Sequence, residues 1–461
     1  MKLLSKNPSK SGSILGEVDE TTQQEILDKI KLAQSVRDEW QNIQLQERIV
    51  LVRDLRASFE ERLEEIANSI SLEMGMPITQ SREEVESGLT YLNWYLDNAE
   101  QYLVPEITFE DDVQIHKVFY EPKGLVASIT PWNYPFSNLI WQSCQNLIVG
   151  NVVINKPDEH TPLTYKLIEK IIDSSELPKG VQQFVYGGKE VGQFLVEQEI
   201  DMICFTGSTK TGEYLYGVAA KKMIPILIEL GGSAPGIVFE DADIDDVIES
   251  IFFNRFSNCG QICDGLKRLI VHKDKFNEVV EKLTAVLKRQ VIGEAVDDKT
   301  TIGPLVDEAQ LDTLLSQFKD AIDKGAEVVC GGKQPDGPDG CYFEPTLLIN
   351  ITKDMRVWKE EVFGPILPVI SFETKDEAIE LANDTAYGLG GYIFTTNDEI
   401  FDEVSRKLKT GMVARNNLSY IIPNDPFGGV KKSGIGRNHG KYGFRELCNI
   451  KVITFEKAKN G

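Results

Sequence analysis

The sequence has few histidines and no clustered cysteine pairs, so it offers no evident metal site. The histidines are His116, His160, His272 and His439, which are spread along the chain. Cys259 and Cys263 could form half of a zinc site, but no second pair follows them. Structural zinc is usually held by four clustered Cys or His ligands. We therefore expect no bound metal.

Long apolar runs are also lacking. No stretch approaches the roughly 20 apolar residues that a membrane helix needs, and the opening MKLLSKNPSKSG has no apolar core of secretory length. The seven cysteines, scattered from Cys144 to Cys448, form no disulfide framework and suit a reducing compartment. We expect a cytoplasmic protein that does not bind membranes.

Positive charge is scarce relative to negative charge. The chain of 461 residues has 49 Lys and Arg against 72 Asp and Glu, which gives a formal net charge of −23. Nucleic acids and anionic membranes are bound through clustered Lys and Arg, so neither is expected as a partner. The hydrophobic content of 41% is that of an ordinary globular protein, long enough here for two or three domains.

The first hundred residues are predicted to be helical. Apolar residues at helical spacing follow a cap at Asp19 or Thr21, and further helices are expected over 44–74 and 78–102. The period then changes, because residues 104–121 alternate around an Asp-Asp turn and predict a β-hairpin. A lone hairpin is only marginally stable, so we expect it either to pair with another element or to form an edge of the main sheet.

From Gly124 onward, strands and helices alternate, which is typical of parallel sheets covered by helices. Strands are expected at 125–129, 152–155, 182–185, 202–205 and 224–229, then at 236–239, 269–272, 327–330, 366–372 and 392–394, with a last one at 449–455. The predicted fold class is α/β, with two Rossmann-like parallel-sheet lobes and a small β-hairpin. Such sheets bind ligands at the carboxyl ends of their strands.

Cys263 is the candidate nucleophile. It lies in the segment FSNCGQICDGLKR, between a predicted helix over 243–256 and a predicted strand, and Gly260 would allow close backbone approach. A thiol reacts when nearby positive charge, a base or amide donors favour its thiolate. Taken alone, a cysteine is more often a small buried apolar residue.

The segment FTGSTKTG, residues 205–212, follows a predicted strand and opens a helix. Gly207 and Ser208 would there present amide groups and a helix N-terminus to a pyrophosphate. The segment is neither a Walker motif, since Glu213 stands in the lysine position, nor a GxGxxG fingerprint. It is weak evidence for a nucleotide by itself.

The segment KPDE, residues 156–159, follows another predicted strand of the same lobe. A carboxylate there can accept hydrogen bonds from the ribose hydroxyls of NAD, and it would repel the 2′-phosphate of NADP. Asp158 and Glu159 therefore favour NAD, although a solvated turn is the better explanation of the segment when it is considered alone.

Taken together, seven motifs in order resemble the aldehyde dehydrogenase superfamily. They are TPWNYP at 130–135, NKP at 155–157, FTGS at 205–208, IELGG at 228–232, GQIC at 260–263, EEVFGP at 360–365, and PFGG at 426–429 with SGIGR at 433–437. The resemblance covers the chain from about residue 6 to its end. The short N-terminus and the Lys-Arg after GQxC are similar to the bacterial succinate-semialdehyde-dehydrogenase-like branch.

The resemblance implies roles for individual residues. Cys263 matches the nucleophile, Glu229 the general base and Asn133 the side-chain donor of the oxyanion hole, in an NAD-dependent, non-acylating oxidation of an aldehyde to an acid. The cofactor positions implied in the same way are Pro131, Trp132, Lys156, Glu159, Gly207, Ser208, Glu361 and Phe363.

The substrate side is less constrained. Trp141 stands where semialdehyde-using relatives carry an Arg, which is like the pocket of enzymes for uncharged aldehydes. The candidate pocket residues are Tyr134, Trp141, Tyr420, Ile421 and Phe427, and core packing is an equal alternative for each. Asp264 directly after the nucleophile is unusual for the family. Because it would disfavour a thiolate, we expect it to point away.

The resemblance also implies an NAD-binding domain of 1–103 and 123–231, a catalytic domain of 232–432, and an oligomerisation hairpin and C-terminal strand of 104–122 and 433–461, in a homodimer or homotetramer. Several alternatives stay open: a succinate-semialdehyde-type or NADP-using dehydrogenase, a CoA-acylating enzyme, and a catalytically silent binding or structural homologue. A Cys-His hydrolase would have to use His160 or His272.

Overall fold

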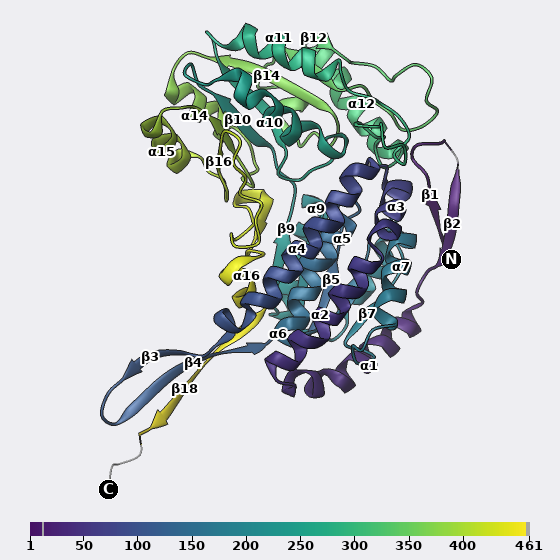
Figure 1. Cartoon of the computed structure of the whole chain (residues 1–461), viewed down its shortest axis with the longest axis vertical. Coiled ribbons are helices and arrows are strands. Elements are labelled where there is room, and N and C mark those ends of the chain that lie inside the picture. Colours follow the sequence, from purple (N-terminus) through teal and green to yellow (C-terminus); the bar gives the residue numbers. More distant parts are fainter. Residues whose placement is uncertain (12, 458–461) are drawn as a thin grey trace.

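The computed structural model describes residues 1–11 and 13–457. The chain forms two lobes, each built around its own sheet and hydrophobic core, with a ribbon of three strands projecting from one lobe (Figure 1). This confirms the predicted α/β class. No helix within the described ranges combines the length and the apolar character that crossing a membrane requires.

The N-terminal region begins with a strand pair that the sequence analysis did not predict. β1 (Lys2–Lys6) pairs antiparallel with β2 (Ile14–Asp19). The first helix is therefore capped by Thr22, whose side chain and Glu25 form a capping box, and not by Asp19 or Thr21.

Four helices follow: α1 (Gln23–Asn42), α2 (Leu45–Glu61), α3 (Leu63–Met74) and α4 (Ile78–Leu103). The single helix predicted over 44–74 is two helices, because Arg62 leaves helical geometry between them. α3 ends at Gly75, whose φ of 83° suits glycine. α4 runs across the first lobe (Figure 1).

The first lobe contains a six-stranded sheet in the order β17-β9-β8-β5-β6-β7. Its parallel strands are β5 (Leu125–Ile129), β6 (Val152–Lys156), β7 (Gln182–Phe184), β8 (Met202–Thr206) and β9 (Ile226–Glu229), and the short β17 (Gly434–Ile435) pairs antiparallel with β9. Its helices are α5 (Pro135–Leu139), a π-helical turn (Ile140–Cys144), α6 (Gln145–Val149), α7 (Pro162–Asp173), α8 (Lys189–Glu197) and α9 (Thr209–Lys222).

The second lobe contains a seven-stranded sheet in the order β12-β13-β14-β11-β10-β15-β16. Its strands are β10 (Ala234–Val238), β11 (Leu266–His272), β12 (Glu327–Cys330), β13 (Thr346–Ile349), β14 (Ile366–Phe372), β15 (Tyr392–Phe394) and β16 (Ala414–Arg415). Its helices are α10 (Ile244–Phe256), α11 (Phe276–Leu287), α12 (Glu308–Asp323), α13 (Arg356–Lys359), α14 (Lys375–Asn383) and α15 (Asp398–Lys407). The strands β13, β16 and β17 were not predicted.

The predicted hairpin consists of β3 (Glu106–Glu110) and β4 (Gln114–Pro122). After α16 (Gly440–Glu446), the C-terminal β18 (Cys448–Glu456) pairs antiparallel with β4 along its whole length. The hairpin thus pairs with another element of the same chain, which was the first of the two expectations, and does not form an edge of the main sheet. The ribbon extends away from the lobes (Figure 1).

Candidate active site

The nucleophile loop follows α10 and makes a tight reversal before Cys263. Asn258 and Cys259 both have left-handed backbone angles, with φ of 48° and 54°. Gly260 has a φ of 73°, and a Cβ there would lie 2.5 Å from the carbonyl oxygen of Gly364. A side chain at position 260 is therefore excluded both by conformation and by space. This explains the glycine of the GQIC motif.

The Cys263 thiol faces Asp264. Its Sγ lies 3.8 Å from Asp264 Oδ1, within the range of a weak S–H hydrogen bond. Asp264 is 3% exposed, and the Tyr392 phenol donates to its backbone carbonyl oxygen at 3.2 Å. The expectation that Asp264 points away is wrong, because this loop turns both side chains to the same side. Burial, and then the Asp264 carboxyl, raise the pKa of Cys263 well above its usual value, while Lys267 acts in the opposite direction.

Glu229 ends β9 and is 3% exposed. Neither of its carboxyl oxygens has a hydrogen-bond partner among the described residues. Burial raises the pKa of Glu229 well above its usual value, and the positive Arg437 opposes that shift. Gly428 packs against the carboxyl group, since a Cβ there would lie 2.7 Å from Glu229 Oε1. The site thus holds a buried carboxyl group that no protein donor occupies.

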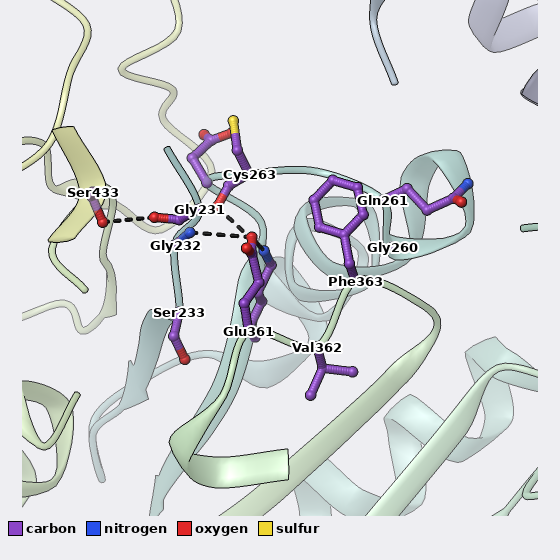
Figure 2. A network of polar contacts seen from close by, with 12 residues as sticks. Gly231, Gly232, Ser233, Gly260, Gln261, Cys263, Glu361, Val362, Phe363 and Ser433 are labelled. Atoms are coloured by element: carbon purple, nitrogen blue, oxygen red, sulfur yellow. Dashed lines mark hydrogen bonds and ion pairs between the residues drawn. The ribbon is translucent and has the colours of Figure 1, made fainter. Parts of the chain in front are cut away.

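The segment after Glu229 is fixed by the C-terminal part of the chain. β17 pairs with β9, and the Ser433 hydroxyl donates to the carbonyl oxygen of Gly231 at 2.8 Å (Figure 2). The SGIGR motif therefore positions the IELGG motif.

Asn133 lies between β5 and α5 and joins the two lobes. Its Nδ2 donates to the carbonyl oxygen of Gln261 at 3.0 Å, and its own carbonyl oxygen accepts from Asn258 Nδ2 at 3.0 Å. Only one amide hydrogen of Asn133 is used by the Gln261 contact. The second hydrogen could bond an oxygen atom bound beside Cys263.

Glu361 is held from two sides. Gly232 N donates to Glu361 Oε1 at 3.1 Å, and the Lys267 ammonium forms an ion pair with the same oxygen. Figure 2 shows the Glu361 carboxylate beside the Gly232 amide and below Cys263. Lys267 Nζ also donates to the carbonyl oxygen of Cys263 at 3.3 Å and lies 4.9 Å from the centre of the Phe363 ring.

One cavity of about 510 Å³ brings most of the predicted site residues together. Its lining includes Pro131, Trp132, Asn133, Tyr134, Trp141, Gly207, Ser208, Glu229, Cys263, Glu361, Phe363, Ile421 and Phe427. Three predicted residues lie outside it. Lys156 and Glu159 form an ion pair of 3.2 Å at the end of β6, and the Tyr420 ring packs against that of Tyr392, with centroids 5.5 Å apart.

The turn between β8 and α9 can accommodate a pyrophosphate. Ser208 caps α9 by accepting from Thr211 N, and a Cβ at Gly207 would lie 2.5 Å from the Phe205 ring, which would have to shift. Thr209 Oγ1 is buried without a partner among the described residues. Because the Ser208 cap occupies only one of the first N–H groups of the helix, this N-terminus beside an unpaired hydroxyl is a suitable anion site.

The sequence analysis missed Lys267 as a site residue. The available signal was the Lys267–Arg268 pair at the start of a predicted buried strand, because lysine is almost never fully buried unless it is paired. Lys267 is 1% exposed.

The two histidines considered for a hydrolase lie elsewhere. His160 bonds Asp158 at 2.6 Å and Asp307 at 3.0 Å, and neither His160 nor His272 is among the described residues that line the cavity. Nor does any group of three or more His, Cys, Asp or Glu in the described ranges have an arrangement that could hold a metal ion.

Comparisons with known proteins identify the family of this chain. The model of the aldehyde dehydrogenase family matches residues 2–453. The chain is 34% identical over 459 residues to an aminoaldehyde dehydrogenase of Pisum sativum, covering 97% of this chain and 91% of that protein. It is 34% identical over 425 residues to a succinate-semialdehyde dehydrogenase [NADP(+)] of Deinococcus radiodurans, covering 92% and 89%. The chain therefore belongs to the aldehyde dehydrogenase family and is an enzyme of that family.

Solved structures are similar over nearly the whole chain. A betaine aldehyde dehydrogenase of Staphylococcus aureus in complex with NAD⁺ superposes with a TM-score of 0.94 at 31% identity, covering 98% of this chain and 91% of that one. An NAD-dependent aldehyde dehydrogenase of Sinorhizobium meliloti gives a TM-score of 0.96 at 31% identity, covering 100% and 92%.

Proposed function

We propose that this protein oxidises an aldehyde to a carboxylic acid with NAD, through a thioester on Cys263. The observation that carries this proposal is the convergence of three groups on one cavity. A thiol, a buried carboxyl group without a protein partner and an amide with a hydrogen to donate are contributed by Cys263, Glu229 and Asn133. This is the set of nucleophile, base and oxyanion donor that acyl chemistry needs.

The first step is attack of the Cys263 thiolate on the aldehyde carbon. A carbon–sulfur bond forms and the carbonyl oxygen takes up the negative charge. The second Asn133 amide hydrogen and the Cys263 backbone N–H would stabilise that oxygen where its charge develops. The Cys263 thiol first gives up its proton to water, and the positive Lys267 nearby favours the thiolate that forms.

The cofactor residues fit a dinucleotide. The Gly207–Ser208 turn would hold the pyrophosphate, and Glu361, with Phe363 beside it, would hold the nicotinamide ribose. A bound nicotinamide supplies the hydride acceptor of the oxidation. Glu159 would accept from the adenosine ribose and repel a 2′-phosphate, which supports NAD over NADP.

Glu229 would complete the reaction. Its ionised carboxylate takes a proton from water, the resulting hydroxide attacks the thioester, and the carbon–sulfur bond breaks to release the acid and the thiolate. A CoA-acylating enzyme would not need this base. A silent homologue would have no need to keep all three groups in one cavity.

The proposal also includes a cytoplasmic location and a homodimer or homotetramer. It includes three domains, formed by residues 1–103 with 123–231, by 232–432, and by 104–122 with 433–461. The projecting ribbon supports self-association, because it exposes apolar side chains on its outer strands, among them Ile107, Phe109, Ile450, Val452 and Phe455. Exposed strands of this kind commonly pair across subunits.

The test is NADH formation, followed by its near-ultraviolet absorbance, with aliphatic, aromatic and charged aldehydes. The wild type should reduce NAD, and Cys263→Ala should not. Turnover that survives in Cys263→Ala would remove Cys263 as the nucleophile. A wild type that is silent with every aldehyde would favour the binding-protein alternative.

A further inference from the structure

The cavity has an unusual charge. Its lining includes Glu83, Glu84 and Asp264, in addition to Glu229 and Glu361. Among the described residues that line it, none is Lys, Arg or His. A substrate carboxylate would therefore find no cationic partner there.

Two of these carboxyl groups are buried and incompletely bonded. Asp264 is 3% exposed, and its Oδ2 has no partner among the described residues. Glu84 is 4% exposed; its Oε1 accepts from the Phe136 and Ser137 amides, while its Oε2 has no partner in the described chain. Burial raises the pKa of both carboxyl groups, that of Glu84 to about 8, so a positive ligand group beside either oxygen would stabilise its ionised form.

Aromatic rings also line the cavity. Tyr134, Trp141, Phe253, Tyr392 and Phe427 all line the cavity. The Trp141 and Phe427 rings lie 5.9 Å apart, and both belong to the pocket predicted from the sequence. Ring faces attract ammonium groups, most strongly where water is excluded. Carboxylates combined with aromatic faces form a site for an organic cation.

We propose that the substrate is a short aldehyde that carries an ammonium group, and that Asp264 is the residue that selects it. This inference rests on the proposed function, because the length argument uses Cys263 as the attacking group. Asp264 Oδ1 lies 3.8 Å from the Cys263 sulfur, which would bond the carbonyl carbon. The ammonium nitrogen can reach Asp264 when it stands on the first or second carbon after the carbonyl.

A cationic substrate would also assist the reaction. The Asp264 carboxyl opposes ionisation of the neighbouring thiol and raises the pKa of Cys263. A positive group placed beside Asp264 offsets that negative charge and favours the thiolate. The cation that is selected is thus one that helps to form the nucleophile.

The test uses a pair of aldehydes of one shape and different charge. Trimethylammonio-acetaldehyde and 3,3-dimethylbutanal differ only in the atom that carries the three methyl groups. This atom is a positive nitrogen in the first aldehyde and a neutral carbon in the second. We expect the wild type to prefer the cation in kcat/KM by at least about tenfold, and Asp264→Asn to bring that ratio close to one. Asp54→Asn, which removes an exposed carboxylate of α2, is the matched control and should leave the ratio unchanged.

Equal use of the two aldehydes, or a preference that survives Asp264→Asn, would overturn the inference. Turnover of the neutral aldehyde without that of the cation would overturn it while leaving the proposed function standing. If the wild type oxidised no aldehyde of any charge, both this inference and the proposed function would be contradicted.

If Asp264→Asn does not fold, a binding measurement on the wild type decides whether the cavity selects a cation. Calorimetric titration with choline and with its neutral isostere 3,3-dimethylbutan-1-ol should give tighter binding of choline. Equal affinities, or tighter binding of the neutral alcohol, would contradict a cation site.

Discussion

The Lys267 ammonium joins the nucleophile loop to the Glu361 carboxylate. It pairs with Glu361 and donates to the carbonyl oxygen of Cys263 at 3.3 Å, and it is 1% exposed. One buried cation therefore contacts both the loop that carries the thiol and the carboxylate that we propose for the nicotinamide ribose. A shift of the nucleophile loop would therefore affect the position of Glu361 through Lys267, and a shift of Glu361 would affect the loop in the same way.

Replacing Lys267 with Met should weaken both elements. Glu361 would lose its ion pair, and we expect a loss of about 3 kcal/mol in stability, seen as a lower midpoint of thermal unfolding. The pKa of Cys263 should rise, because Lys267 is the positive group that lowers it, so alkylation by iodoacetamide should shift to higher pH.

The double variant Lys267→Met with Glu361→Gln separates the two effects. It should recover part of the lost stability, since no unpaired charge remains, but not the alkylation rate. An unchanged unfolding midpoint and alkylation profile in Lys267→Met would show that the ion pair contributes neither to stability nor to ionisation of the Cys263 thiol.

Glu229→Gln should separate acylation from release of the acid. We expect a rapid burst of about one NADH per active site and then turnover slowed by about 10²–10⁴-fold. Loss of the burst together with the steady state would argue that Glu229 acts before the thioester forms.

The pH dependence of Glu229 has a definite sign. A carboxyl group acts as a base only when it is ionised, and burial raises the pKa of Glu229. The steady-state rate of the wild type should therefore fall as the pH falls through that raised pKa. The residual rate of Glu229→Gln should lack this acidic limb, and a limb that persists in the variant would assign it to another group.

Glu159→Gln should relax the preference for NAD. Removing the carboxylate removes the repulsion of a 2′-phosphate, so the ratio of kcat/KM for NADP over NAD should rise by about tenfold. Glu190→Gln is the control. Its carboxylate lies near Gly188, as does that of Glu159, but Glu190 belongs to α8 and is not proposed to contact the ribose. An equal rise in both variants would indicate general charge and not a specific ribose contact.

Much of the fold could be predicted, because buried parallel strands leave a strong apolar signal. The predicted bounds of 125–129, 366–372 and 392–394 agree with β5, β14 and β15. The β1–β2 pair was missed because its short strands expose most of their residues and carry little apolar pattern. The break at Arg62 was missed since arginine is a good helix former and carries no stop signal.

The site was only partly predictable for a different reason. Motifs indicated that Cys263, Glu229 and Asn133 belong together, and one cavity does bring them together. The direction of a side chain depends on the loop geometry, which the sequence does not encode locally. That is why Asp264 was expected to point away, and why the pairing of Lys267 with Glu361, 94 residues apart, could not be foreseen.

The most direct test of the account is to locate the acyl group. Glu229→Gln, mixed with a substrate aldehyde and NAD, quenched in acid and digested, should yield an acylated peptide that contains Cys263, identified by mass spectrometry. The same experiment with the double variant Cys263→Ala and Glu229→Gln should yield none. An acyl group on another cysteine, or no acylated peptide despite NADH formation, would contradict the thioester mechanism.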